Sequence, residues 1–248
     1  MTDVHERIRQ FWDDDAKTYD ETKGHAISDP IEAAAWREAL LETLPPRGAR
    51  MLDVGAGTGS LSLLAAELGF EVTALDLSTA MLARAEQKAK DRGLLGMTFV
   101  VGSATDPPKG PFDAVMQRHV LWTVPDPVGA LRAWRAVTKP DGRLVLFDGV
   151  WGPADPLQRG KDIAARAVRK FRGTPSGHHA TYPQEVLTEL PLAESSSRPP
   201  LIAAAEEAGW KAVRIKRLHD IEWAQQLREP QPLGWLERHA GYVVVADA

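Results

Sequence analysis

The chain has 248 residues, and its 30 lysines and arginines against 34 aspartates and glutamates give a formal net charge of −4. This balance argues against a nucleic-acid partner, and the absence of cysteine excludes disulfides, thiolate zinc sites and cysteine nucleophiles. The acidic N-terminus does not resemble a signal peptide, and no apolar run approaches membrane-spanning length. We therefore expect a cytoplasmic protein with no membrane partner.

The first two thirds of the chain alternate helical stretches with short aliphatic runs, which is typical of a parallel sheet with helices on both faces. Residues 1–45 are expected to form entry helices. Ser78 is a candidate helix N-cap, and KPDG at 139–142 is predicted to be a turn before the fifth strand. Strands are predicted at residues 50–54, 71–76, 97–101, 112–117 and 142–149, with helices beginning near Gly59, Ser78 and Pro127.

The alternation stops after Gly149 and returns near residue 201. Between them, residues 151–200 hold a basic helical stretch, a loop rich in glycine, proline and histidine, and a segment rich in serine and proline. The cations of the basic stretch are interpreted as a solvated face or as steering for an acidic small substrate. We expect 151–200 to be a cap insertion within one domain spanning 1–248. A helix at 201–210 and strands at 211–218 and 241–248 complete a Rossmann-like α/β fold, a doubly wound seven-stranded sheet that is mostly parallel.

Three glycines follow the first predicted strand, at Gly55, Gly57 and Gly59. The dinucleotide fingerprint G-x-G-x-x-G would place the third glycine one position later. Glycine lets the strand turn sharply into a helix and lets a ligand lie against bare backbone. Asp53 and Asp76 end the first and second strands, and Asp76 lies where a carboxylate can accept hydrogen bonds from two ribose hydroxyls. The pattern predicts a nucleoside site.

The stretches LDVGAGTG, VTALDLSTAMLARA, FVVGSATDPP, FDAVMQRHVLW and LRAWRAVTKPDGRLVLFD resemble, in this order, the successive motifs of class I S-adenosylmethionine-dependent methyltransferases. The resemblance covers residues 10–150 well and the last third in outline. It implies that S-adenosylmethionine is the cofactor and S-adenosylhomocysteine its product. It also implies a small organic acceptor, methylated on nitrogen, oxygen or carbon, and no metal site.

The resemblance also implies the cofactor contacts. Tyr19 covers the cofactor, Asp76 holds the ribose, and Leu77 and Met81 flank adenine. Relatives commonly carry an acidic partner for the adenine amino group where Ser103 stands, and the serine hydroxyl can still accept a hydrogen bond. The implied set is Tyr19, Asp53, Gly55, Ala56, Gly57, Gly59, Asp76, Leu77, Met81, Ser103, Ala104, Gln117 and Arg118.

Three tryptophans and two histidines are candidates on the acceptor side. Trp12, Trp122 and Trp151 lie where the entry helix and the exits of the fourth and fifth strands should converge, with core packing as the alternative. His178 belongs to a loop at 172–183 that we expect to close over ligand, with plain solvent exposure as the alternative. His119, just beyond the fourth strand, is the candidate general base, with a packed structural histidine as the alternative.

Two other functions stay open on the sequence alone. A nicotinamide oxidoreductase uses the same sheet, but it needs the later glycine and a catalytic tyrosine and lysine or similar groups that the chain does not show. A non-catalytic S-adenosylmethionine-binding protein is compatible with a cap that closes the pocket to any acceptor. In each case we expect a small-molecule partner and a monomer or homodimer.

Overall fold

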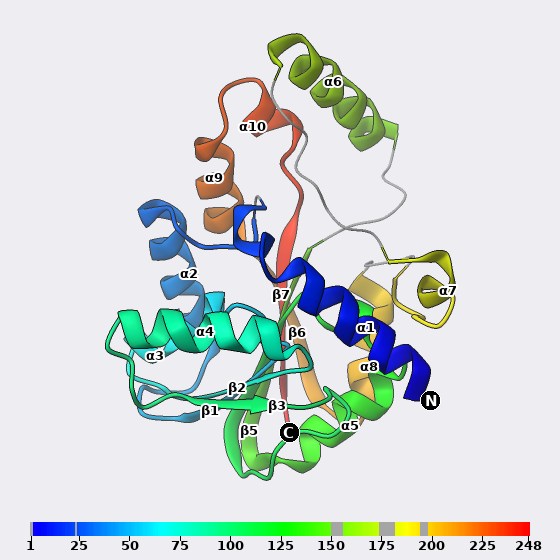
Figure 1. Ribbon diagram of the computed structural model, residues 1–248. Coiled ribbons are helices and arrows are strands. Elements are labelled where there is room, and N and C mark those ends of the chain that lie inside the picture. The colour runs from blue at the N-terminus through cyan, green and yellow to red at the C-terminus, as the bar shows by residue number, and fades with distance from the viewer. Residues whose placement is uncertain (1, 23, 150–155, 174–181, 194–197) are drawn as a thin grey trace.

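The computed structural model describes residues 2–22, 24–149, 156–173, 182–193 and 198–248. Its seven-stranded sheet has the order β3-β2-β1-β4-β5-β7-β6, with helices on both faces (Figure 1). The first five strands of this order run parallel to one another, whereas β7 is antiparallel to both β5 and β6. This arrangement confirms the predicted doubly wound, mostly parallel α/β fold. None of the helices in these ranges has the length and apolar character needed to cross a bilayer.

The central strands follow the apolar runs of the sequence. Strands β1 and β4 and the second half of β5 are mostly buried because helices cover both faces of the sheet, which explains why their sequences read as aliphatic runs. The seven strands are β1 (Arg50–Val54), β2 (Glu71–Asp76), β3 (Thr98–Val101), β4 (Phe112–Arg118), β5 (Thr138–Gly149), β6 (Lys211–Arg217) and β7 (Gly241–Asp247).

The turn predicted at 139–142 is wrong, because the structure places this KPDG sequence inside β5. Phe112 of β4 pairs with Thr138, whereas Ala114, two residues later, pairs with Arg143. The β5 side therefore carries extra residues in this interval, and the ladder is interrupted by a bulge. Proline and glycine here mark an irregularity within a strand and not a connection before it.

Two layers of helices enclose the sheet. On one face pack α2 (Pro30–Thr43), α3 (Ser60–Glu67) and α9 (His219–Arg228), and on the other pack α5 (Pro127–Ala136) and α8 (Arg198–Glu207). Helix α9 was not predicted. The remaining helices are α1 (Thr2–Asp15), α4 (Thr79–Asp91), α6 (Pro156–Arg172), α7 (Gln184–Leu187) and α10 (Leu233–Leu236), with short 3-10 turns at Tyr19–Glu21 and Leu121–Thr123.

The segment expected to form a cap, 151–200, contains α6, α7 and the start of α8 in its described parts. In Figure 1, α6 stands at the top of the molecule beside α10, whereas α1 and α7 lie side by side nearer the sheet. The N-cap prediction is confirmed, because Ser78 Oγ accepts the Met81 N–H at 3.1 Å at the start of α4.

A buried ion pair joins α2 to α9. The fully buried Glu32 accepts hydrogen bonds from Arg228 at 2.5 Å and from Gln225 at 3.0 Å. We expect Arg228→Ala to lower the free energy of unfolding by about 3 kcal/mol, because a buried carboxylate loses its cation while Gln225 keeps one hydrogen bond. Urea denaturation measures this loss. Lys216→Ala, which breaks the exposed pair with Glu42, should lower it by less than about 1 kcal/mol, and equal losses would contradict the prediction.

Candidate active site

A cavity lies at the carboxyl ends of β1 to β4, the edge at which open parallel sheets collect ligands. Helix α1 and the segment that follows it contribute a roof, while the loops after the four strands contribute the floor. The residues that the sequence predicted and that line this cavity are Trp12, Tyr19, Gly55, Gly57, Asp76, Leu77, Met81, Ser103, Ala104, Arg118 and His119.

In the turn after β1, Gly55 and Gly57 are suited to their positions for different reasons. Gly55 and Gly57 both have positive φ, at 66° and 55°, which side-chain-bearing residues rarely adopt. A Cβ on Gly55 would lie 2.2 Å from Val120 Cγ2, so this glycine allows close packing of the turn on the chain beyond β4. A Cβ on Gly57 would meet only Tyr19 Cε1, at 4.0 Å, so Gly57 presents bare backbone to open space in the cavity.

The carboxylate of Asp76 holds this turn in place. Its Oδ2 accepts the Gly57 N–H at 2.7 Å, and its Oδ1 accepts the Ser78 N–H at 2.8 Å. Burial raises the pKa of Asp76 to about 6. Each oxygen has capacity for a further hydrogen bond, so a carboxylate on the cavity wall can accept from two adjacent hydroxyls.

Several predicted cofactor contacts lie behind the cavity wall. Asp53 is 2% exposed and accepts a hydrogen bond from Ser62 Oγ at 2.5 Å, and burial raises its pKa to about 7. Gln117 is fully buried, and its Oε1 accepts the Val120 N–H at 2.6 Å. These side chains shape the loops that carry the lining. The predicted contacts outside the lining are Asp53, Ala56, Gly59 and Gln117.

Two carboxylates tie the N-terminal segment to the sheet. Asp13 of α1 accepts a hydrogen bond from Ser78 Oγ at 2.6 Å, and Asp20 accepts one from Thr58 Oγ1, also at 2.6 Å. Both contacts bring α1 and the chain after it over the glycine turn. As a result Tyr19 is held on the cavity, where burial raises the pKa of its hydroxyl.

The loops after β2 and β3 form an apolar and hydroxyl-bearing wall. Leu77 and Met81 line it from the β2 side, and Ala104 from the β3 side. The hydroxyl of Ser103 lies 2.8 Å from that of Thr105 and accepts the Thr105 N–H at 3.2 Å, so it is engaged in its own turn. Thr105 also lines the cavity, and the sequence analysis missed it.

His119 stands at the junction of β4 and β5. Its backbone is left-handed, with φ of 60°, and its N–H donates to the Phe147 carbonyl at 3.1 Å. Its Nδ1 lies 3.2 Å from Oδ1 of the buried Asp148, while its ring lines the cavity. A strained backbone and a buried carboxylate thus orient this imidazole. Asp148, near the end of β5, was not predicted from the sequence.

Of the three tryptophans and His178 predicted on the acceptor side, the structure describes only two tryptophans. Trp12 lines the cavity, whereas Trp122 packs behind it against Tyr182, with ring centroids 5.5 Å apart. Trp151 and His178 lie outside the described residues. Lining residues that the sequence analysis missed include His5 and Ile8, which share one face of α1 with Trp12, and Thr123. His5, Ile8 and Trp12 are three and four residues apart, and on a helix this spacing predicts that His5 and Ile8 lie on the same face as Trp12.

Comparison with known proteins decides the family. Residues 52–146 match a family model described as a methyltransferase domain. A demethylmenaquinone methyltransferase of Beutenbergia cavernae is 32% identical over 223 residues, which cover 87% of this chain and 87% of the relative. The chain belongs to the class I S-adenosylmethionine-dependent methyltransferase family. It therefore uses S-adenosylmethionine and transfers the methyl group to a small organic acceptor, which decides against the oxidoreductase and the non-catalytic binding protein.

Two further likenesses agree with this assignment. A ubiquinone biosynthesis O-methyltransferase of Xanthomonas axonopodis is 39% identical over 112 residues, which cover 44% of this chain and 46% of the relative. The crystal structure of the [4+2]-cyclase SpnF superposes with a TM-score of 0.65 at 18% identity, covering 97% of this chain and 95% of that one. The second likeness concerns the fold alone.

We expect Gly57→Val to abolish S-adenosylmethionine binding, because its side chain would fill the open space beside the turn. Isothermal titration measures the binding. Gly69→Val is the matched control, since Gly69 also has positive φ and open space around it but does not line the cavity. A folded Gly57→Val variant with normal affinity would show that the ligand lies elsewhere.

The affinity for S-adenosylmethionine should fall as the pH drops through about 6, the pKa to which burial raises Asp76. Ribose hydroxyls that donate to this carboxylate would bind its ionised form, so protonation should oppose binding. Titrations across this pH range measure the effect. Asp76→Ala should lose about 1.5 to 3 kcal/mol of binding free energy and this pH dependence, whereas Asp53→Asn should keep it. A wild-type affinity that is constant across this range contradicts the ribose role.

Proposed function

We propose that the acceptor is a hydroxylated aromatic molecule of the quinol type and that His119, oriented by Asp148, takes the proton from its hydroxyl. The observation that carries this proposal is the contact of Nδ1 with a buried carboxylate, made by an imidazole that lines the cavity. Two relatives are named for demethylmenaquinone and for ubiquinone biosynthesis, which supports a quinol-like acceptor.

The lining of the cavity fits the cofactor. Gly57 offers open backbone, Asp76 offers two carboxylate oxygens, and Leu77 and Met81 offer an apolar surface of the kind that an adenine ring needs. In the proposal the Gly57 backbone contacts the methionine portion of the cofactor, and Asp76 binds its ribose. Leu77 and Met81 flank the adenine, and Tyr19 covers the cofactor. When bound, S-adenosylmethionine supplies both the electrophilic methyl group and the sulfur leaving group.

The remaining work of the protein is orientation and proton transfer. With a proton on Nδ1, His119 donates to Asp148, which fixes the ring and leaves Nε2 in the form that accepts a proton. The acceptor hydroxyl gives its proton to Nε2. The resulting negative charge would make that oxygen, or the ring carbon beside it, nucleophilic towards the methyl group that the bound cofactor would supply.

Aromatic side chains support a planar acceptor. Trp12 lines the cavity and packs edge-on against both Tyr19 and Tyr182, with centroid distances of 5.9 Å in each case. The Tyr182 side chain is buried beside it. In the proposal this cluster excludes water from the acceptor side, which favours methyl transfer by orientation and desolvation.

The other expectations about architecture and partners stay part of the proposal. We infer one domain over 1–248 in which the entry helices of 1–45 and the cap at 151–200 enclose a small-molecule substrate. The net charge of −4 supports the exclusion of nucleic acid. We infer further that the enzyme is a cytoplasmic monomer or homodimer, which sedimentation velocity and cell fractionation test.

His119→Ala should lose roughly a hundredfold to ten-thousandfold in turnover, the range for removal of a general base, while cofactor affinity stays within a few-fold. Transfer of labelled methyl groups to a panel of quinols and phenols measures turnover. Asp148→Asn should lower turnover with little change in cofactor affinity, because it removes the group that orients the ring. His219→Ala, on the exposed start of α9, is the control and should keep full activity. If His119→Ala keeps more than about a tenth of wild-type turnover, the acceptor needs no base, which favours an amine or an already nucleophilic carbon.

A further inference from the structure

Helix α6 turns an apolar stripe outward. Its inner face packs on α10 through Ala165 and Val168. At 100° per residue, Ile163, Ala167 and Phe171 follow one another at intervals of four residues on the opposite face. Ile163 is 61% exposed and Phe171 is 93% exposed, and Ala167 between them is exposed as well. An amphipathic helix of a globular protein normally buries such a stripe, so this one is arranged for an external partner.

A row of cations borders the same stripe. Arg159, Arg166 and Lys170 are all exposed and lie along one edge of it, and the described part of the chain pairs none of them with a carboxylate. Arg169 on the inner side differs, because Glu229 and Glu237 pair with it. Over its length α6 carries six cations and one carboxylate. The outward face is therefore apolar and positively charged at once.

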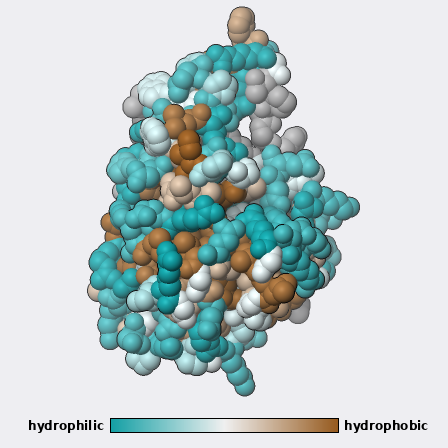
Figure 2. Space-filling model, turned by 90° about the vertical axis from the view of Figure 1, so that its left-hand side faces the viewer, coloured by the Kyte–Doolittle hydropathy of each residue, from teal (hydrophilic) through white to brown (hydrophobic). Residues whose placement is uncertain are grey.

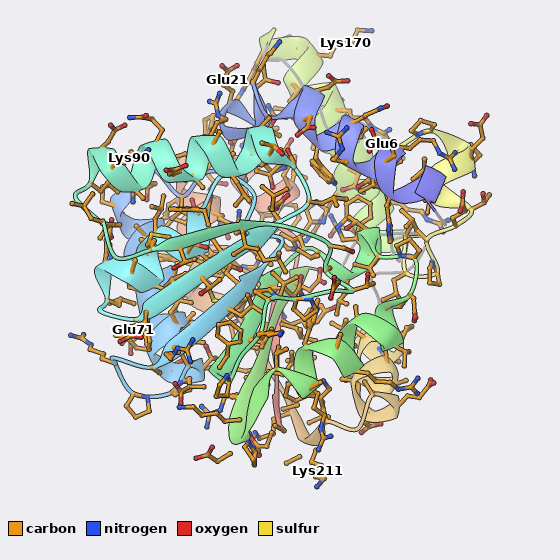
Figure 3. All side chains as sticks on the ribbon, turned by 60° about the horizontal axis from the view of Figure 1, so that its bottom comes forward. Glu6, Glu21, Glu71, Lys90, Lys170 and Lys211 are labelled. Atoms are coloured by element: carbon orange, nitrogen blue, oxygen red, sulfur yellow. The ribbon has the colours of Figure 1, made fainter. Side chains whose placement is uncertain are left out.

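The position of the helix makes this face accessible. In Figure 1 α6 stands at the top of the molecule, away from the sheet, and Figure 2 shows hydrophobic atoms at the extreme top above a mostly hydrophilic surface. The side chain of Lys170 points away from the body of the protein in Figure 3. Beside the helix, Trp235 of α10 is half exposed and holds Lys161 over its ring, with Nζ 4.5 Å from the centroid.

We propose that α6 docks the enzyme on an anionic lipid surface, with Ile163, Ala167 and Phe171 inserted between headgroups and the bordering cations against lipid phosphates. Basic residues beside a Phe-containing apolar stripe are typical of helices that lie in a membrane interface. The expectation of no membrane partner depended on the net charge of −4 and on the lack of a spanning segment. An interfacial helix needs no spanning segment, and α6 is itself positively charged.

Two features favour lipid over a protein partner. A single protruding helix offers a narrow convex strip, whereas a stable protein interface buries about 800 Å² on each side. In an antiparallel two-fold dimer built on this face, the rows of Arg159, Arg166 and Lys170 would approach their own copies, and like charges would repel. A surface of lipid phosphates matches both the apolar stripe and its charge.

Docking goes beyond the proposed function and does not depend on it. One consequence does depend on it. Because β5 ends at Gly149, directly after the partner of His119, and α6 begins at Pro156, the docking helix follows the catalytic wall closely in sequence. An apolar quinol dissolved in lipid would then meet the enzyme at the surface where it is concentrated.

Cosedimentation with vesicles tests the proposal in the absence of any acceptor. The wild-type chain should bind vesicles of phosphatidylcholine with phosphatidylglycerol, and vesicles of phosphatidylcholine alone should retain it poorly. Phe171→Ser should lower the partition coefficient about tenfold or more. Arg166→Ala and Lys170→Ala should each lower it about fivefold. Leu95→Ser, at a residue 81% exposed between α4 and β3, is the matched control and should change nothing.

Each other result overturns the proposal. The proposal is wrong if the wild-type chain does not bind anionic vesicles. It is also wrong if Leu95→Ser lowers vesicle binding as much as Phe171→Ser does. Binding that ignores the anionic lipid and the cations removes the charge recognition on which the proposal depends. Sedimentation velocity tests whether the stripe binds a second copy of this chain instead. If the wild-type chain is a dimer that Phe171→Ser dissociates, and it does not bind vesicles, the stripe serves self-association. Unchanged S-adenosylmethionine affinity of the variants shows that they are folded, and it separates this test from the proposed function.

Discussion

The carboxylate of Asp76 is the constraint on which the site depends. Parallel pairing of β1 with β2 places it beside the glycine turn, where it accepts the N–H groups of Gly57 and Ser78. Burial raises the pKa of this carboxyl to about 6, and its two hydrogen bonds fix the turn that the glycines allow. The same carboxylate thus joins the glycine turn to the residue that caps α4.

The site combines a floor of strand ends with a roof from the N-terminal segment. The floor is strand-end backbone, held by the ladder between β1, β2 and β4. The roof is α1 and the chain after it, tied down by Asp13 and Asp20. His119 belongs to the floor, because β4 and β5 fix both the imidazole and Asp148. Methyl transfer depends mainly on orientation, and hydrogen bonds fix both the floor and the roof around the cavity.

The sequence predicted those features that depend on local pattern. Buried parallel strands read as aliphatic runs, and the glycine turn with Asp76 is a contiguous motif, so both were found. Proline and glycine mark bulges as well as turns, so 139–142 was misassigned to a turn. The Asp148 partner of His119 depends on register between two strands, and the aromatic packing around Tyr182 joins segments far apart in the chain. No local pattern encodes either contact.

A crystal structure with S-adenosylhomocysteine bound tests the central claim most directly. The account predicts that both ribose hydroxyls lie within hydrogen-bond distance of Asp76 and that the backbone of Gly57 contacts the methionine portion. The sulfur should face a space bounded by His119 and Trp12, where an acceptor can approach in line with the departing bond. Ribose bound away from Asp76, or a sulfur that faces away from His119, would contradict the account.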